Sequence, residues 1–137
     1  MAAANRHYSQ RLIKGIVGEY ELYGRPDGLI SSGRREPEKP FFAFQEHYST
    51  WYDPDGERNV APSAGQVLAA MLVGQSLNPT PQIPLYGCYI NGSIWKLVTL
   101  VGKEYTISNG FNALTDDIFD IFRLLKSLKE IVKERVA

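Results

Sequence analysis

A short run of aromatic and apolar residues from Phe41 to Phe44 constrains the fold more than any other feature of this sequence. It follows Pro40 and reads Phe-Phe-Ala-Phe, so consecutive residues are apolar rather than alternate ones. Because the side chains of a strand point alternately to its two faces, such a run predicts a strand that is buried on both faces. We expect this strand to extend to Tyr48 and to lie in the middle of a sheet.

Clear signals for helices and further strands follow the aromatic strand. Two segments have apolar residues at helical spacing. The first ends before Pro79, and the second, near the end of the sequence, has acidic residues at its start and basic residues at its end. Between them, Asn91-Gly92 separates two apolar runs, which predicts a β-hairpin. The expected elements are a helix at Ser63 to Asn78, strands at Leu85 to Ile90, Ser93 to Val101 and Glu104 to Ser108, and a helix at Asp116 to Val136.

The first forty residues have weaker patterns. Apolar residues recur every three or four positions from Asn5 to Val17, which predicts an amphipathic helix. Glu19 to Tyr23 alternates acidic and apolar residues, which is typical of a strand with one solvent-exposed face. A bend and a short apolar piece at Leu29-Ile30 follow, and we interpret Ser31 to Pro40 as a connecting loop.

Composition places the chain in the globular α/β class. Its 137 residues suit a single domain, and 44% hydrophobic with 22% charged residues is typical of a folded protein. The net charge of +0 gives no overall positive field toward nucleic acid. The chain contains neither an apolar run of about 18 residues nor a signal-peptide pattern. We therefore expect a soluble, cytoplasmic protein without a membrane partner.

Several kinds of site lack a sequence signal. There is no phosphate-binding glycine loop and no nucleophile-elbow motif, and His7 and His47 are not at zinc-ligand spacing from each other or from Cys88. Cys88 is the only cysteine, which excludes an intramolecular disulfide. It is either a small apolar residue within a strand or a nucleophile paired with His47, and the first interpretation is favoured.

Carboxylates near the early strands are the remaining candidates for chemistry. Residues 41–95 contain four acidic residues and a single cation, Arg58, so metal or proton-transfer chemistry is most plausible there. Glu46 follows Phe42 and Phe44 on one face of the strand, at the point where the apolar residues on that face end. A carboxylate in such a position is solvated, or it acts as a metal ligand or a base. Asp27 lies in Pro-Asp-Gly, a common turn tripeptide, and is either a turn residue or a ligand.

Pro26-Asp27, followed after 18 residues by Glu46-His47-Tyr48, resembles the signature of the PD-(D/E)XK nucleases, the restriction-endonuclease-like superfamily. The helix that contains Gln66 and the strand near Tyr86 are similar to the elements that follow the signature in that superfamily. The resemblance covers roughly residues 19–134. It implies a restriction-endonuclease-like fold with a mixed sheet and the element order α-β-β-β-α-β, here followed by a hairpin or meander and a long helix.

The resemblance also implies a site. Asp27 and Glu46 would hold Mg²⁺, Glu19 would be an accessory carboxylate, and Gln66 would face the site from the helix. The reaction would be Mg²⁺-dependent hydrolysis of DNA phosphodiesters. Tyr48 stands where the superfamily has its lysine, and a phenolic hydroxyl brings no positive charge.

The absent motif lysine leaves two functions open. A lysine from elsewhere, such as Lys39 or Lys96, would preserve an active nuclease, although the sequence does not place either residue at the site. Without one, the chain would be a catalytically inactive binding or assembly module of the same fold. The expected partners are accordingly DNA, another protein, or further copies of the chain.

Overall fold

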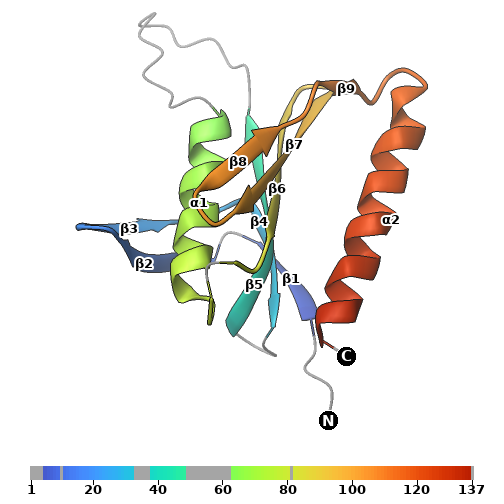
Figure 1. The fold of residues 1–137 in the computed structure, drawn as a ribbon. Helices are drawn as coiled ribbons and strands as arrows, with labels where there is room; N and C mark the ends of the chain where they lie inside the picture. The colour runs from blue at the N-terminus through green and yellow to red at the C-terminus, as the bar shows by residue number, and fades with distance from the viewer. Residues whose placement is uncertain (1–4, 10, 33–37, 49–62, 81, 137) are drawn as a thin grey trace, which may run out of the picture.

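A mixed β-sheet separates two helices in the computed structural model of the chain (Figure 1). The structure describes residues 5–9, 11–32, 38–48, 63–80 and 82–136. The strands are β1 (Asn5–Ser9), β2 (Ile13–Val17), β3 (Tyr20–Gly24), β4 (Gly28–Ser32), β5 (Glu38–Tyr48), β6 (Leu85–Asn91), β7 (Ile94–Val101), β8 (Glu104–Ile107) and β9 (Phe111–Asn112). The helices are α1 (Ser63–Leu77) and α2 (Asp117–Val136).

The main sheet has the order β1-β4-β5-β6-β7-β8, and β9 also pairs with β7. Only β5 and β6 are parallel among the described strands, and α1 lies between them in the sequence, as a parallel connection requires. β2 and β3 form a separate two-stranded sheet. The α/β class with a mixed sheet is therefore confirmed.

The central position predicted for the aromatic strand is confirmed. β5 lies between β4 and β6, and the neighbouring residues Ala43 and Phe44 are both buried although they point to opposite faces. β5 begins at Glu38, earlier in the sequence than we expected, and β4 continues to Ser32. Part of the predicted loop from Ser31 to Pro40 is therefore strand.

The helix predicted for Asn5 to Val17 is wrong, because these residues contribute to strands β1 and β2. Burial alternates along both strands: Tyr8 and Ile13 are buried, while their neighbours His7 and Lys14 are exposed. Apolar residues at these spacings suit a strand as well as a helix. Gly15 and the β-branched residues around it lower helix propensity, and tertiary pairing decides the outcome. The α-β-β-β-α-β order consequently lacks its first helix among the described residues.

The hairpin and the two later helices are confirmed. Gly92 and Gly102 have φ values of 60° and 59°, so both adopt the left-handed conformation that turns between antiparallel strands require. β8 extends the hairpin to a meander. Among the described residues, no helix is long and apolar enough to cross a membrane.

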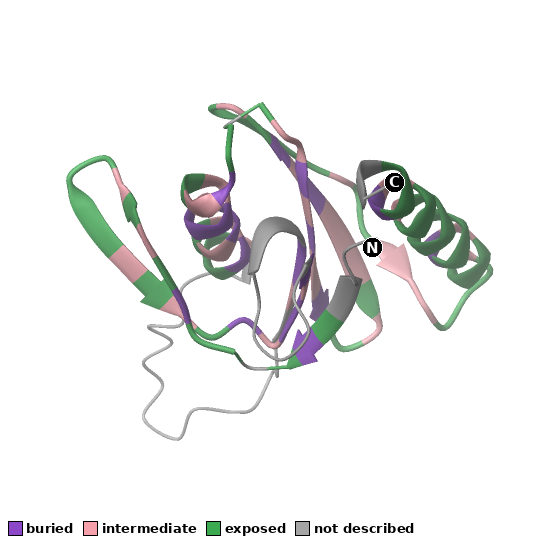
Figure 2. Cartoon of the chain, turned by 90° about the horizontal axis from the view of Figure 1, so that it is seen from below, coloured by how far each residue is buried: buried purple, intermediate pink, exposed green. Residues whose placement is uncertain are grey.

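The hydrophobic core lies between α1 and one face of the sheet (Figure 2). Its fully buried members include Leu29, Val67, Met71, Leu85 and Val98. α2 runs beside the opposite face and is covered less completely (Figures 1 and 2). Ile121 and Val132 of α2 are buried, whereas the apolar residues beside them on the helix are largely exposed.

The close approach of α1 to β6 depends on Gly87. A Cβ atom added at Gly87 would lie 2.8 Å from Met71 Sδ and 2.9 Å from Val67 Cγ2, and both neighbours are fully buried. We expect Gly87→Ala to lower the free energy of unfolding by about 1 to 3 kcal/mol, measured by urea denaturation. Gly65→Ala is the control, since nothing lies within 4 Å of that position and alanine favours a helix. Equal stability of Gly87→Ala and the parent would contradict this account of the packing.

Candidate functional site

The structure brings the backbone positions of Asp27 and Glu46 to the same end of two neighbouring strands. Asp27 is half-buried in the bend immediately before β4. The first residue of β4, Gly28, pairs with Gln45 of antiparallel β5, and Glu46 is the next residue of β5. Asp27 and Glu46 thus each lie one residue beyond the Gly28–Gln45 pair. Side chains directly opposite in such a ladder have Cβ atoms about 5 Å apart.

The side chains of Glu46 and Tyr48 lie outside the described part of the structure, and only their strand pairing is described. Glu46 pairs with Tyr89 of β6, and Tyr48 pairs with Asn91. Phe44, two residues before Glu46, lies in the core beneath α1. The period-two pattern of the sequence therefore predicts that the site opens on the α1 side of the sheet.

Gln66 of α1 borders a hollow of about 320 Å³ beside the segment that carries Asp27. Arg25 and Pro26, which precede Asp27, line the same hollow, and Pro26 is buried. Gln66 is exposed in the first turns of α1. The helix residues that follow it along this wall include Ala69 and Ala70, whose small side chains leave the space open. The helix thus places Gln66 beside the hollow that Arg25 and Pro26 also line, and its role facing the site stays a prediction.

Glu19 is not brought to this site by the structure. It follows Gly18 in the turn at the tip of the β2–β3 hairpin, and it is exposed. The hairpin projects away from the main sheet (Figures 1 and 2). Four residue steps along the strand separate the Ile13–Gly24 pair at the root from the Val17–Tyr20 pair near the tip, which corresponds to roughly 14 Å.

Lys96 lies on the same row of the sheet as Glu46. Tyr89 of β6 pairs with Glu46 on one side and with Lys96 of β7 on the other. Two strand spacings, about 10 Å, therefore separate the backbones of Glu46 and Lys96. Lys96 is half-buried and shares the strand face of Val98, which packs in the core beneath α1. Its side chain leans toward Gly110, since Lys96 Cε lies 3.8 Å from the point that a Cβ atom would occupy there.

The donor set suits Mg²⁺ but is small. Among the described side chains, no group of three or more His, Cys, Asp or Glu residues is placed to hold a metal ion. The predicted ligands are two carboxylates, Asp27 and Glu46. Mg²⁺ in proteins is commonly held by one or two carboxylates, with waters and phosphate oxygens completing the octahedron. Two carboxylates at one strand end therefore fit this ion when a phosphate is also present.

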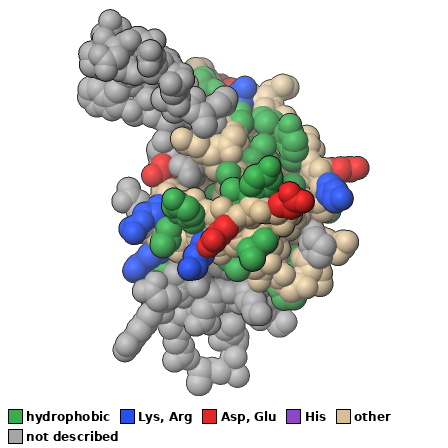
Figure 3. Space-filling model, turned by 90° about the vertical axis from the view of Figure 1, so that its left-hand side faces the viewer, with side chains coloured by type: hydrophobic (Ala, Val, Ile, Leu, Met, Phe, Trp, Pro, Cys, Tyr) green, Lys and Arg blue, Asp and Glu red, His purple; other side chains and the backbone are tan. Residues whose placement is uncertain are grey.

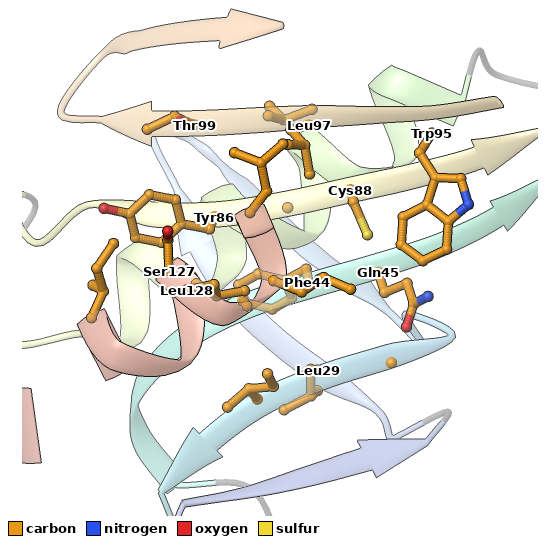
Figure 4. Close-up of a pocket in the computed structure, with 18 of the residues that line it drawn as sticks. Leu29, Phe44, Gln45, Tyr86, Cys88, Trp95, Leu97, Thr99, Ser127 and Leu128 are labelled. Atoms are coloured by element: carbon orange, nitrogen blue, oxygen red, sulfur yellow. The ribbon is translucent and has the colours of Figure 1, made fainter. Parts of the chain in front are cut away.

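A second cavity, of about 370 Å³, lies between the opposite face of the sheet and α2 (Figure 4). Cys88 points into it between Tyr86 and Trp95, with Gln45 nearby and Leu128 of α2 on the other side of the cavity. Burial raises the pKa of the Cys88 thiol from 9.0 to about 11. The thiol is therefore protonated at neutral pH, which favours the interpretation of Cys88 as a small apolar residue over that of a nucleophile.

The raised pKa predicts slow reaction of Cys88 with thiol reagents. A shift of about two units lowers the thiolate fraction about 100-fold at any pH below 9. We expect Ellman's reagent to modify the folded chain at least about 100-fold more slowly than the same chain in guanidinium. Because the unfolded thiol ionises at lower pH than the folded one, stability should also fall as pH rises from 9.0 toward 11. Comparable rates for the folded and unfolded chains would contradict this.

No family model, curated protein or solved structure matches the chain.

Proposed function

We propose that this chain is a nuclease-like domain of the PD-(D/E)XK type, in which Asp27 and Glu46 hold one Mg²⁺ ion and the substrate is DNA. The observation that carries the proposal is the register of β4 and β5. Two carboxylate residues, separated by 18 residues in sequence, lie one position beyond the same Gly28–Gln45 pair. A cation bound by both residues would stabilise their ionised carboxylates, and this register of the two strands allows it.

The order of strands supports the same proposal. β1, β4 and β5 form an antiparallel run, α1 follows, and β6 returns parallel to β5. This order agrees with the β-β-β-α-β part of the core that the resemblance implies. The β2–β3 hairpin is then an insertion between the first two strands of that core.

Each residue near the site has a role that its chemistry allows. A bound Mg²⁺ ion would polarise the scissile phosphate and lower the pKa of the attacking water. Asp27 and Glu46 would hold the positively charged ion at one end of the β4–β5 pair. The amide of Gln66 both donates and accepts hydrogen bonds at the neighbouring hollow. Tyr48 supplies a hydroxyl without charge. For Lys96 to supply the missing positive charge, its side chain has to turn from Gly110 toward β6 and the row of Glu46.

Cleavage of supercoiled plasmid DNA in the presence of Mg²⁺ or Mn²⁺ tests this function. We expect the parent to nick the plasmid, and Asp27→Asn and Glu46→Gln to abolish nicking. Glu19→Gln is the matched control, because it also removes a carboxylate but lies at the tip of the hairpin, and it should cut like the parent. If the parent cuts the plasmid with neither ion, the proposed nuclease activity is rejected.

The second candidate is an inactive DNA-binding module, which Tyr48 at the lysine position favours. In that case the chain would retard DNA in a mobility assay without cutting it, and chelation of metal ions would leave the retardation unchanged. An active nuclease should instead lose cleavage on chelation.

A further inference from the structure

The cavity between α2 and the sheet has a floor made by one face of the strands β4 to β7. Ala43 of β5 pairs with Tyr86 of β6, and Tyr86 pairs with Thr99 of β7. Paired residues project from the same side of a sheet, so this row lies on the face opposite Phe44 and the core beneath α1. The adjacent row on the same face contains Gly28, Gln45, Cys88 and Leu97.

Small residues in this floor leave space above the sheet. Gly28, Ala43 and Cys88 border the cavity with small side chains or none, whereas Tyr86 and Trp95 stand at its opposite ends (Figure 4). The row of Tyr86 and the row of Trp95 are four residue steps apart along β6, which corresponds to roughly 14 Å. The floor is therefore long enough for a molecule of several rings or a short alkyl chain.

α2 covers the floor without filling the space. Leu124, Leu128 and Ile131 follow one another at about one helical turn and border the cavity from the helix. Leu124 and Leu125 are 37% and 40% exposed although both line the cavity, and Leu97 on the sheet is only half-buried. A molecule seated between the helix and the sheet would remove this apolar surface from water, which favours its binding.

The lining carries no fixed charge. None of the described residues that border the cavity is Lys, Arg, Asp or Glu, and the raised pKa of Cys88 keeps its thiol neutral. Charged side chains lie elsewhere, for example on the side from which the β2–β3 hairpin projects (Figure 3). An ionised group in the cavity would lose its hydration without gaining a partner of opposite charge. The cavity therefore favours an uncharged ligand.

Hydrogen-bonding groups lie at one end of the cavity. Gln45 Oε1 is 3.1 Å and His7 Nε2 is 2.6 Å from the point that a Cβ atom of Gly28 would occupy, so both groups lie over this glycine. Trp95 stands at the same end (Figure 4). A side-chain amide both donates and accepts hydrogen bonds, so Gln45 can bind a carbonyl, hydroxyl or amine group. Ser127 at the other end is exposed, which gives an entry from solvent.

We propose that this cavity binds an uncharged, largely apolar small molecule, with one polar group beside Gln45 and its apolar part between Cys88 and Leu128. An apolar cavity of about 150 Å³ holds benzene. The volume here, about 370 Å³, is more than twice as large and suits a molecule of two or three aromatic rings or an alkyl chain of similar size. The proposal is independent of the nuclease activity, because the predicted Mg²⁺ site opens on the other face of the sheet.

Titration with N-phenylnaphthylamine, an uncharged three-ring amine that fluoresces in apolar surroundings, tests the proposal. One molecule should bind per chain, with a dissociation constant in the micromolar range. Anilinonaphthalene sulfonate has the same rings and an added negative charge, so it should bind at least about tenfold more weakly. In a Trp51→Phe background, where Trp95 is the only tryptophan, excitation of Trp95 should produce probe emission by energy transfer.

Two variants of α2 locate the bound probe. Ser127→Trp adds a large ring to the cavity from an exposed position, so it should weaken binding of the amine about tenfold or more. Lys129→Trp is the matched control, because Lys129 is also exposed on α2 but does not border the cavity, and it should bind the probe like the parent. The proposal would be overturned by a parent that binds no amine, by equal affinities of the two variants, by equal affinity for the sulfonate, or by the absence of energy transfer from Trp95.

Discussion

Replacing Leu85 with alanine is expected to lower the free energy of unfolding by about 2 to 5 kcal/mol. Leu85 begins β6 and is 0% exposed in the core beneath α1. Its removal leaves a cavity between the helix and the sheet, because the close-packed neighbours, Val67 and Met71 of α1 among them, relax only partly. A domain of this size has a total stability of roughly 5 to 15 kcal/mol, so this loss is a large fraction of it.

Leu114→Ala is the matched control for this measurement. The residue type is the same, but Leu114 is 84% exposed in the turn before α2. Urea denaturation of the two variants should separate them by at least about 2 kcal/mol, with Leu114→Ala within about 0.5 kcal/mol of the parent. Equal stability of the two variants would mean that the core is not where the structure places it.

Replacing Lys96 with glutamine is expected to slow DNA cleavage by about 100-fold or more. The proposed site has a hydroxyl at Tyr48 where a cation is needed, and Lys96 lies on the row of Glu46 and Tyr89. Removal of its charge should lower kcat more than it raises KM, because the charge acts on the phosphate as the transition state forms. Lys96→Arg, which keeps the charge, should retain part of the rate.

Two further variants separate this role from a general effect of charge. Lys103→Gln removes an exposed cation from the turn after β7 and should leave cleavage unchanged. Tyr48→Lys in the Lys96→Gln background should recover activity, because it places a cation at the motif position itself. A Lys96→Gln variant that cuts DNA as fast as the parent would exclude Lys96 from the site.

The central part of the fold could be predicted from local patterns. The run from Phe41 to Phe44 predicted a central strand, Asn91-Gly92 predicted a hairpin, and α2 has a clear apolar period. In each case local propensity and tertiary packing agree, so the sequence alone was sufficient. The N-terminal residues differ, because the spacing of Tyr8, Ile13 and Val17 suits either a helix or two strands. Their pairing decides between them: β1 pairs with the more distant β4, and β2 pairs with the adjacent β3.

The candidate site could be predicted only in part, for the same reason. Asp27 and Glu46 belong to a recognisable motif, and their approach depends on one antiparallel pair. Lys96 is 50 residues beyond Glu46 in sequence and reaches the same row through two successive pairings of β6. No local pattern carries this information. Glu19 shows the opposite case, since closeness in sequence to Asp27 does not bring it near the strand ends.

A Mn²⁺ titration followed by electron paramagnetic resonance tests most directly whether Asp27 and Glu46 share one ion. The parent should bind one Mn²⁺ per chain, and Asp27→Asn and Glu46→Gln should each weaken binding about tenfold or more. The double variant should bind little worse than either single variant, because both ligands hold the same ion and their effects are not independent. The shared site would be contradicted if both single variants bound Mn²⁺ with the same affinity as the parent and Glu19→Gln.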